Sequence, residues 1–180
     1  MAVKRLFIGT FVDYTLFEPL YGEIVDELGE VVFGKWTEIN NLHFTYKFLG
    51  NIEIDKIDSI VESLGDTLGL KESPLKIRGL GCFPTPNNPR IVYARLFNPD
   101  NSIKQNYEII EKKMTALGFA PEVKYFVPHV TLMRVKSSLT GFADKLKTYN
   151  NMPIGLMPSY KINLVESSLT NKGPIYNIIA

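Results

Sequence analysis

The apolar positions of this chain switch repeatedly between strand-like and helix-like patterns. Residues 6–12 form a short apolar, aromatic-rich run that predicts a buried strand. Asp13 then offers an N-cap, and apolar residues recur at helical spacing as far as Gly29. Residues 31–39 and 43–49 are typical of strands. The first part of the chain therefore predicts a strand, a helix and two further strands.

The middle of the chain continues this alternation. An apolar stripe at helical spacing predicts a helix over residues 55–68. Residues 75–80 and 90–97 predict two strands. The proline-rich stretch 84–89 between them excludes a regular helix or a central strand there.

A second helix is predicted between Asp100, which can cap it, and Gly118, which ends it. The remaining predicted elements are, in order, a strand at 127–135, a weak helix at 139–149, and two strands at 161–169 and 175–179. This order predicts an α+β fold with mostly antiparallel sheets. At 180 residues, the chain fits one domain spanning residues 1–180.

The chain has two histidines, and a threonine follows each of them by two positions. Histidine can give and take protons near neutral pH. Because side chains alternate across a strand, His43 and Thr45 point to one face, with Cα atoms about 6.6 Å apart. His129 and Thr131 have the same relation. If the two strands face each other, two imidazoles and two hydroxyls converge on one site, which suits a phosphodiester.

The composition limits the class of protein but does not identify its function. The chain is 45% apolar and 22% charged, which is typical of an ordinary globular protein. A net charge of +1 does not favour binding along duplex nucleic acid, which needs a broad positive surface. It still allows a local site for a small anion or an RNA end. The single Cys82 and two histidines do not complete a zinc site. No secretory signal or membrane-spanning stretch is recognised, so a cytoplasmic location is expected.

At the two His-x-Thr frames the sequence resembles the 2H phosphoesterase superfamily. Within it, the chain is most similar to the bacterial and archaeal RNA 2′,3′-cyclic phosphodiesterases, also called RNA 2′,5′-ligases. The segments that carry this resemblance occur in family order at residues 4–8, 36, 41–50, 79–84, 89–94, 118–119, 128–134 and 164–167.

The resemblance implies a bilobed, pseudo-two-fold duplicated fold, with two antiparallel sheets and flanking helices around a central cleft. It also implies metal-independent opening of a 2′,3′-cyclic phosphate to a 2′-phosphate, without a cofactor. By analogy with the family, His43 donates a proton to the departing oxygen and His129 accepts one from water. Thr45 and Thr131 would hold the phosphate oxygens, and Arg134 would flank the base or the phosphate.

Two further cations are candidates for substrate contacts. Strand alternation places Lys47 on the face of His43 and Thr45, where it would contact phosphate, although a solvated lysine fits the pattern equally well. Arg90 follows the proline-rich loop and is either a cleft residue or a charge at a strand edge. The aromatic residues Phe11, Tyr46 and Tyr93 either pack in the core or shape the base pocket, and the sequence leaves this open.

The expected substrates are RNA 2′,3′-cyclic phosphate ends or cyclic nucleotides, acted on by a monomer that does not bind membranes. Two alternatives stay open at this point. One is RNA 2′,5′-ligation of tRNA half-molecules through the same site. The other is a non-catalytic module that binds nucleotides or RNA ends.

Overall fold

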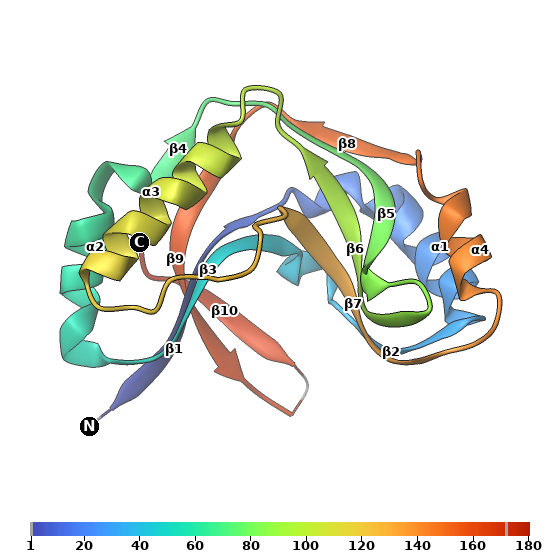
Figure 1. The fold of residues 1–180 in the computed structure, drawn as a ribbon, viewed down its shortest axis with the longest axis horizontal. Coiled ribbons are helices and arrows are strands. Elements are labelled where there is room, and N and C mark those ends of the chain that lie inside the picture. The colour runs from blue at the N-terminus through green and yellow to red at the C-terminus, as the bar shows by residue number, and fades with distance from the viewer. Residues whose placement is uncertain (1, 172) are drawn as a thin grey trace.

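The computed structural model describes residues 2–171 and 173–180. It contains two five-stranded sheets, in which the paired strands run antiparallel, with helices on their outer sides (Figure 1). The predicted α+β fold with two antiparallel sheets is therefore confirmed.

The first sheet has the strand order β10-β9-β1-β3, and β4 pairs with β9 outside this path. Its strands are β1 (Val3–Phe11), β3 (His43–Glu53), β4 (Gly69–Lys71), β9 (Tyr160–Leu169) and β10 (Pro174–Ile178). The second sheet has the order β2-β7-β6-β5-β8. Its strands are β2 (Val32–Trp36), β5 (Leu75–Thr85), β6 (Asn88–Phe97), β7 (His129–Ser138) and β8 (Pro153–Met157).

The four α-helices of the described residues lie on the outer sides of the two sheets, in two pairs. Helices α2 (Ile57–Leu64) and α3 (Ser102–Ala116) cover the first sheet, whereas α1 (Glu18–Gly29) and α4 (Phe142–Thr148) cover the second (Figure 1). Each buries apolar side chains spaced at helical intervals, as Ile57, Ile60 and Leu64 do in α2. None of the described helices is long and apolar enough to cross a bilayer.

The observed elements differ from the predicted ones mainly at their ends. The helix predicted from Asp13 begins as a 3₁₀ turn at Tyr14–Leu16, whose N-cap is the Asp13 carboxylate, and the α-helix starts only at Glu18. Three further 3₁₀ turns lie at Ile39–Asn41, Ile54–Lys56 and Gly65–Thr67. The last two turns shorten the helix predicted over residues 55–68, which is α-helical only over Ile57–Leu64. The short strands β4 and β8 were not predicted from the sequence.

Two places where the sequence predicts no strand lie inside strands in the structure: Gly50, just after the strand predicted at 43–49, and the ends of the proline-rich stretch 84–89. β3 continues through Gly50, which pairs with Leu6 and has a φ of +79°, a conformation that glycine adopts without strain. The proline-rich stretch forms the tip of the β5–β6 hairpin, where Pro84 pairs with Pro89. Neighbouring strands pair with this hairpin only further from the tip, so the missing proline N–H groups break no pairing with β7 or β8.

The chain passes repeatedly between the two sheets. It starts in the first sheet with β1, adds α1 and β2 to the second, and returns with β3. The buried apolar side chains of both sheets form one connected core. The sheets meet where β3 contacts β7, and we call this region the junction. Each strand of the junction carries one His-x-Thr frame.

Candidate active site

The two histidines occupy equivalent positions at the junction. His43 is the first residue of β3 and His129 is the first residue of β7. His43 pairs with Phe11 of β1, and His129 pairs with Arg95 of β6. The fold therefore brings together the two histidines that the sequence singles out.

Each imidazole is held in the same way by the backbone. The Nδ1 of His43 lies 2.7 Å from the carbonyl oxygen of Asn41, and the Nδ1 of His129 lies 2.7 Å from that of Val127. Because a carbonyl oxygen can only accept, Nδ1 carries the hydrogen in both rings. Nε2 is then the nitrogen that can exchange a proton with a substrate.

Aromatic side chains surround the His43 ring. Phe7 lies 4.9 Å from it between ring centroids, Phe11 lies 5.7 Å away, and Tyr176 of β10 meets it edge-on at 5.0 Å. These contacts hold the ring plane and exclude water from one side of it. The side chain of Asn41 also donates to the carbonyl of Pro174, so β10 is tied to the backbone that orients His43.

His129 has a matching aromatic environment from the second sheet. Phe83 and Tyr93 meet its ring edge-on, with centroids at 5.0 and 5.3 Å. In both halves, the supporting ring lies against a glycine. A methyl group on Gly9 would lie 2.9 Å from the Phe7 ring, and one on Gly81 would lie 2.7 Å from the Tyr93 ring. Both glycines therefore leave room for a ring that supports a histidine.

The surroundings of the two imidazoles shift their pKa values downward. Burial lowers the pKa of His43, and the hydrogen bond to the Asn41 carbonyl opposes this shift. The charges of Arg134 and His129 lower the pKa of His43 further. Burial also lowers the pKa of His129, against the hydrogen bond to Val127. Both rings are therefore mostly neutral near pH 7 in the free protein.

Thr45 and Thr131 lie on the strand faces that carry the histidines. Thr45 pairs with Gly9 and Thr131 with Tyr93, each two residues along from the paired histidine. Both side chains are half-buried. Within the described residues, neither hydroxyl hydrogen-bonds to the protein, so both are available to a ligand.

A β-bulge follows each threonine and changes which later residues share its face. Tyr46 has no partner in the β1–β3 pairing, and Leu132 has none in the β6–β7 pairing. Alternation therefore slips by one residue. The third position on the histidine face is Phe48 in β3 and Arg134 in β7. Arg134 is exposed, and its charge acts on His43, so it lies near the His43 imidazole.

The predicted position of Lys47 on the histidine face is wrong. The bulge at Tyr46 turns Lys47 toward the helices, where only 7% of the side chain is exposed. Its Nζ donates to Glu111 of α3 at 2.7 Å and to the carbonyl of Ala120 at 2.9 Å. Lys47 is therefore part of a buried ion pair and does not reach the junction.

The other residues whose roles the sequence left undecided lie partly in the core and partly at the site. Tyr46 is 4% exposed and packs in the core against Phe44, away from the histidines. Phe11 and Tyr93 contact the imidazole rings instead. Arg90 is exposed and is the unpaired extra residue of an irregularity in the β5–β6 hairpin. Its role in substrate binding stays a prediction.

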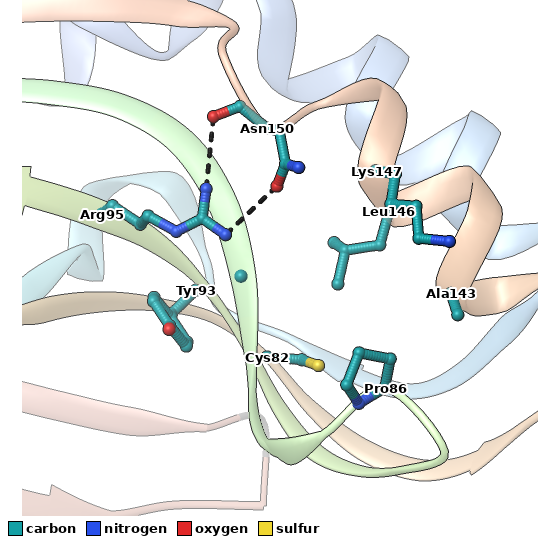
Figure 2. A pocket seen from close by; sticks show the side chains of 9 residues that line it. Cys82, Pro86, Tyr93, Arg95, Ala143, Leu146, Lys147 and Asn150 are labelled. Carbon is teal, nitrogen blue, oxygen red and sulfur yellow. Dashed lines mark hydrogen bonds between the residues drawn. The ribbon is translucent and has the colours of Figure 1, made fainter.

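Tyr93 also lines a cavity of about 240 Å³ between β5 and α4 (Figure 2). Arg95 crosses this region and donates to the backbone and side-chain oxygens of Asn150, both at 3.2 Å. Arg95 thus ties β6 to the end of α4. The cavity adjoins the aromatic support of His129 and does not contain either histidine.

Two side chains of the site were not selected from the sequence. Phe48 is 63% exposed although it is a large aromatic residue, and it lies on the face of His43 and Thr45. Tyr176 contacts the His43 ring from the last strand. Strand alternation could not find Phe48 because of the bulge, and Tyr176 belongs to no local motif. Within the described part of the chain, no group of three or more His, Cys, Asp or Glu side chains could hold a metal ion.

Comparisons with known proteins agree with this geometry. A family model described as LigT like Phosphoesterase matches residues 21–93. The RNA 2′,3′-cyclic phosphodiesterase of Aquifex aeolicus is 31% identical over 99% of this chain and 96% of that protein. The enzyme of the same name from Archaeoglobus fulgidus is 34% identical over 96% of both chains.

Solved structures show the same fold. The crystal structure of E. coli LigT complexed with 3′-AMP matches with a TM-score of 0.76, at 20% identity over 99% of this chain and 97% of that one. The crystal structure of TT0787 from Thermus thermophilus matches with a TM-score of 0.68, at 23% identity over 98% and 95%.

The fold and the paired motifs define a phosphoesterase of the two-histidine class. The chain belongs to the family of RNA 2′,3′-cyclic phosphodiesterases, as its similarity over nearly the full length of curated members shows.

Proposed function

We propose that this protein hydrolyses the 2′,3′-cyclic phosphate at an RNA or nucleotide end to a 2′-phosphate, with His43 as general acid and His129 as general base. The observation that carries the proposal is the matched pair of imidazoles. Each has its Nδ1 fixed by a carbonyl at 2.7 Å, which leaves Nε2 for the reaction.

In the proposed reaction, His129 Nε2 takes a proton from water as the water oxygen forms a bond to phosphorus. The bond between phosphorus and the ribose O3′ breaks, and His43 Nε2 gives its proton to O3′. The products are a 2′-phosphate and a 3′-hydroxyl. The two histidines end with exchanged protonation states, which proton exchange with solvent restores.

The other residues of the histidine faces suit the charged groups of this substrate. Thr45 and Thr131 donate hydrogen bonds to the non-bridging phosphate oxygens, and Arg134 offsets their negative charge. The exposed ring of Phe48 offers a stacking surface for the terminal base. Curated relatives named RNA 2′,3′-cyclic phosphodiesterase support this substrate class.

Because the pKa of His43 is lowered in the free protein, the bound substrate must favour the protonated form of this ring. In the free protein, burial and the nearby Arg134 charge keep this ring mostly neutral. A bound phosphodiester brings a negative charge that offsets Arg134 and favours the imidazolium form. Substrate binding is therefore coupled to proton uptake at His43.

Product analysis tests the proposal. Adenosine 2′,3′-cyclic phosphate is incubated with the wild-type protein and with His43→Ala and His129→Ala, with and without EDTA. We expect the 2′-phosphate as product, a loss of rate of about 10²–10⁴-fold or more in each variant, and no effect of EDTA.

Wild-type-like hydrolysis by His129→Ala would refute the assignment of the base. Binding of a 2′-phosphorylated nucleotide without any turnover would favour the non-catalytic module instead. Joined rather than hydrolysed tRNA halves with cyclic ends would favour ligation.

A further inference from the structure

One arginine from each sheet lies near Tyr176, next to the histidine pair. Tyr176 lies on β10, and its ring contacts those of His43 at 5.0 Å and Phe7 at 5.4 Å. Burial raises the pKa of the Tyr176 phenol, and the charges of Arg134 and Arg5 lower it, so both guanidinium groups lie near the phenol. The Tyr176 hydroxyl has no hydrogen-bond partner among the described residues.

Arg5 extends the site along the first sheet. It lies two residues before Phe7 on β1, so the two side chains share one strand face. Two residues of strand place it about 6.6 Å further along from Phe7. Lys4, its neighbour on the opposite face, is neutralised by Glu166 at 2.8 Å.

Lys35 approaches the same region from the second sheet. It pairs with Arg134 across β2 and β7, which puts both side chains on one face. The Lys35 Nζ also lies near Gly173, in the turn before β10. A methyl group built on this glycine would lie 3.6 Å from that Nζ. The Glu38 carboxylate is near the same glycine, but Lys35 and Glu38 form no ion pair within 4.0 Å in the described residues.

These cationic side chains have no partner within the described protein and can therefore bind a ligand. Within the described chain, Arg5, Lys35 and Arg134 form no ion pair or hydrogen bond with the protein. Lys47, in contrast, is paired with Glu111. Arg134, near the His43 imidazole, matches the single negative charge of the reacting phosphodiester, so Arg5 and Lys35 provide positive charge beyond that.

We propose that Arg5 and the Tyr176 hydroxyl form a second phosphate subsite, with Lys35 beside Arg134 at its edge, and that this subsite binds the phosphodiester linking the terminal nucleoside to the preceding nucleotide. The inference rests on the proposed function and makes it narrower, because the preferred substrate is then the end of an RNA chain rather than a free cyclic mononucleotide. Such contacts read the backbone and not the sequence.

The test compares two substrates in each of four proteins. The substrates are adenosine 2′,3′-cyclic phosphate and the dinucleotide ApA with a 2′,3′-cyclic end. The proteins are the wild type, Arg5→Gln, Lys35→Gln and the control Lys112→Gln. Lys112 is an exposed cation on α3, which covers the outer side of the first sheet.

We expect the wild type to prefer the dinucleotide. Arg5→Gln and Lys35→Gln should each lower the ratio of kcat/KM for dinucleotide over mononucleotide by about tenfold, the cost of one hydrogen bond to a charged group. Lys112→Gln should leave the ratio unchanged. Rising salt should weaken turnover of the dinucleotide less in Arg5→Gln and Lys35→Gln than in the wild type.

An unchanged ratio in both variants, or an equal loss on both substrates, would overturn the subsite while leaving the proposed hydrolysis intact. Failure of the wild type to hydrolyse either substrate would overturn the proposed function, and the subsite with it.

Discussion

At the scale of single residues, the site depends on which imidazole nitrogen is free. The carbonyls of Asn41 and Val127 occupy Nδ1 in His43 and His129. Both rings therefore present Nε2 without needing a carboxylate to orient them. Because a carbonyl is uncharged, it fixes the tautomer without strongly favouring the imidazolium form, and burial can then lower the pKa of each ring.

The threonine hydroxyls provide the first prediction at this scale. Thr45→Val and Thr131→Val preserve side-chain shape and β-branching but remove the donor to a phosphate oxygen. Each should lower kcat/KM about 10- to 100-fold, as expected for one hydrogen bond to a charged group. Steady-state kinetics on adenosine 2′,3′-cyclic phosphate measures this. The matched control is Thr85→Val, an exposed strand residue at the tip of the β5–β6 hairpin. Losses below twofold in both site variants would contradict the role of the hydroxyls.

At the scale of elements, two β-bulges decide which side chains join the site. Strand alternation from the sequence correctly places Thr45 beside His43, because no bulge separates them. It fails for Lys47, which lies just after the bulge at Tyr46. The same kind of bulge in β7 brings Arg134 onto the histidine face. A bulge depends on pairing with a distant strand, so local sequence does not indicate it.

Lys47 provides a prediction about stability. Lys47→Met leaves the Glu111 carboxylate, which is 15% exposed, without its cation. This should lower the free energy of unfolding by about 3–5 kcal/mol. The double variant Lys47→Met/Glu111→Leu should recover much of that loss, because no buried charge remains. Urea unfolding measures both. Unchanged stability of Lys47→Met, together with weaker phosphate binding, would restore the interpretation of Lys47 as a ligand contact.

The glycine beneath Tyr93 provides a second prediction at this scale. Gly81→Ala introduces a methyl group 2.7 Å from the Tyr93 ring, which must move and release His129. We expect kcat to fall about tenfold or more with a smaller change in KM, as for other small misplacements of catalytic groups. The control is Gly22→Ala in α1, where a methyl group meets nothing within 4 Å. It should stabilise the protein by about 0.5–1 kcal/mol and leave kcat unchanged. Equal effects of both variants on kcat would contradict the role of Gly81.

At the scale of the whole molecule, the chain path explains why the two motifs meet. β3 and β7 belong to different sheets and contact each other at the junction. The sequence predicted the class of the fold and the histidine pair, because both follow from local periodicity and a repeated motif. It did not predict β4 and β8, which have three and five residues and little periodicity. Tyr176 was also missed, because only the path of the chain brings β10 to His43.

Burial of two histidines in one site makes stability depend on pH. Both have a lower pKa in the folded state, so below their usual value of about 6.5 the unfolded chain binds more protons. The free energy of unfolding should therefore fall as pH decreases from 7.5 to 5.5. Urea unfolding at both pH values, in the wild type and in His43→Asn/His129→Asn, measures this. The double variant should lose less stability. An equal loss in both proteins would mean that other groups cause the dependence.

The most direct test of the paired acid and base is the pH dependence of kcat/KM for a 2′,3′-cyclic nucleotide in the wild type, His43→Ala and His129→Ala. The wild type should give a bell-shaped profile, because one imidazole must be protonated and the other neutral. His43→Ala should lose the decline at high pH, and His129→Ala should lose the decline at low pH. Loss of the opposite limbs, or a bell that survives in either variant, would contradict the assignment of acid and base.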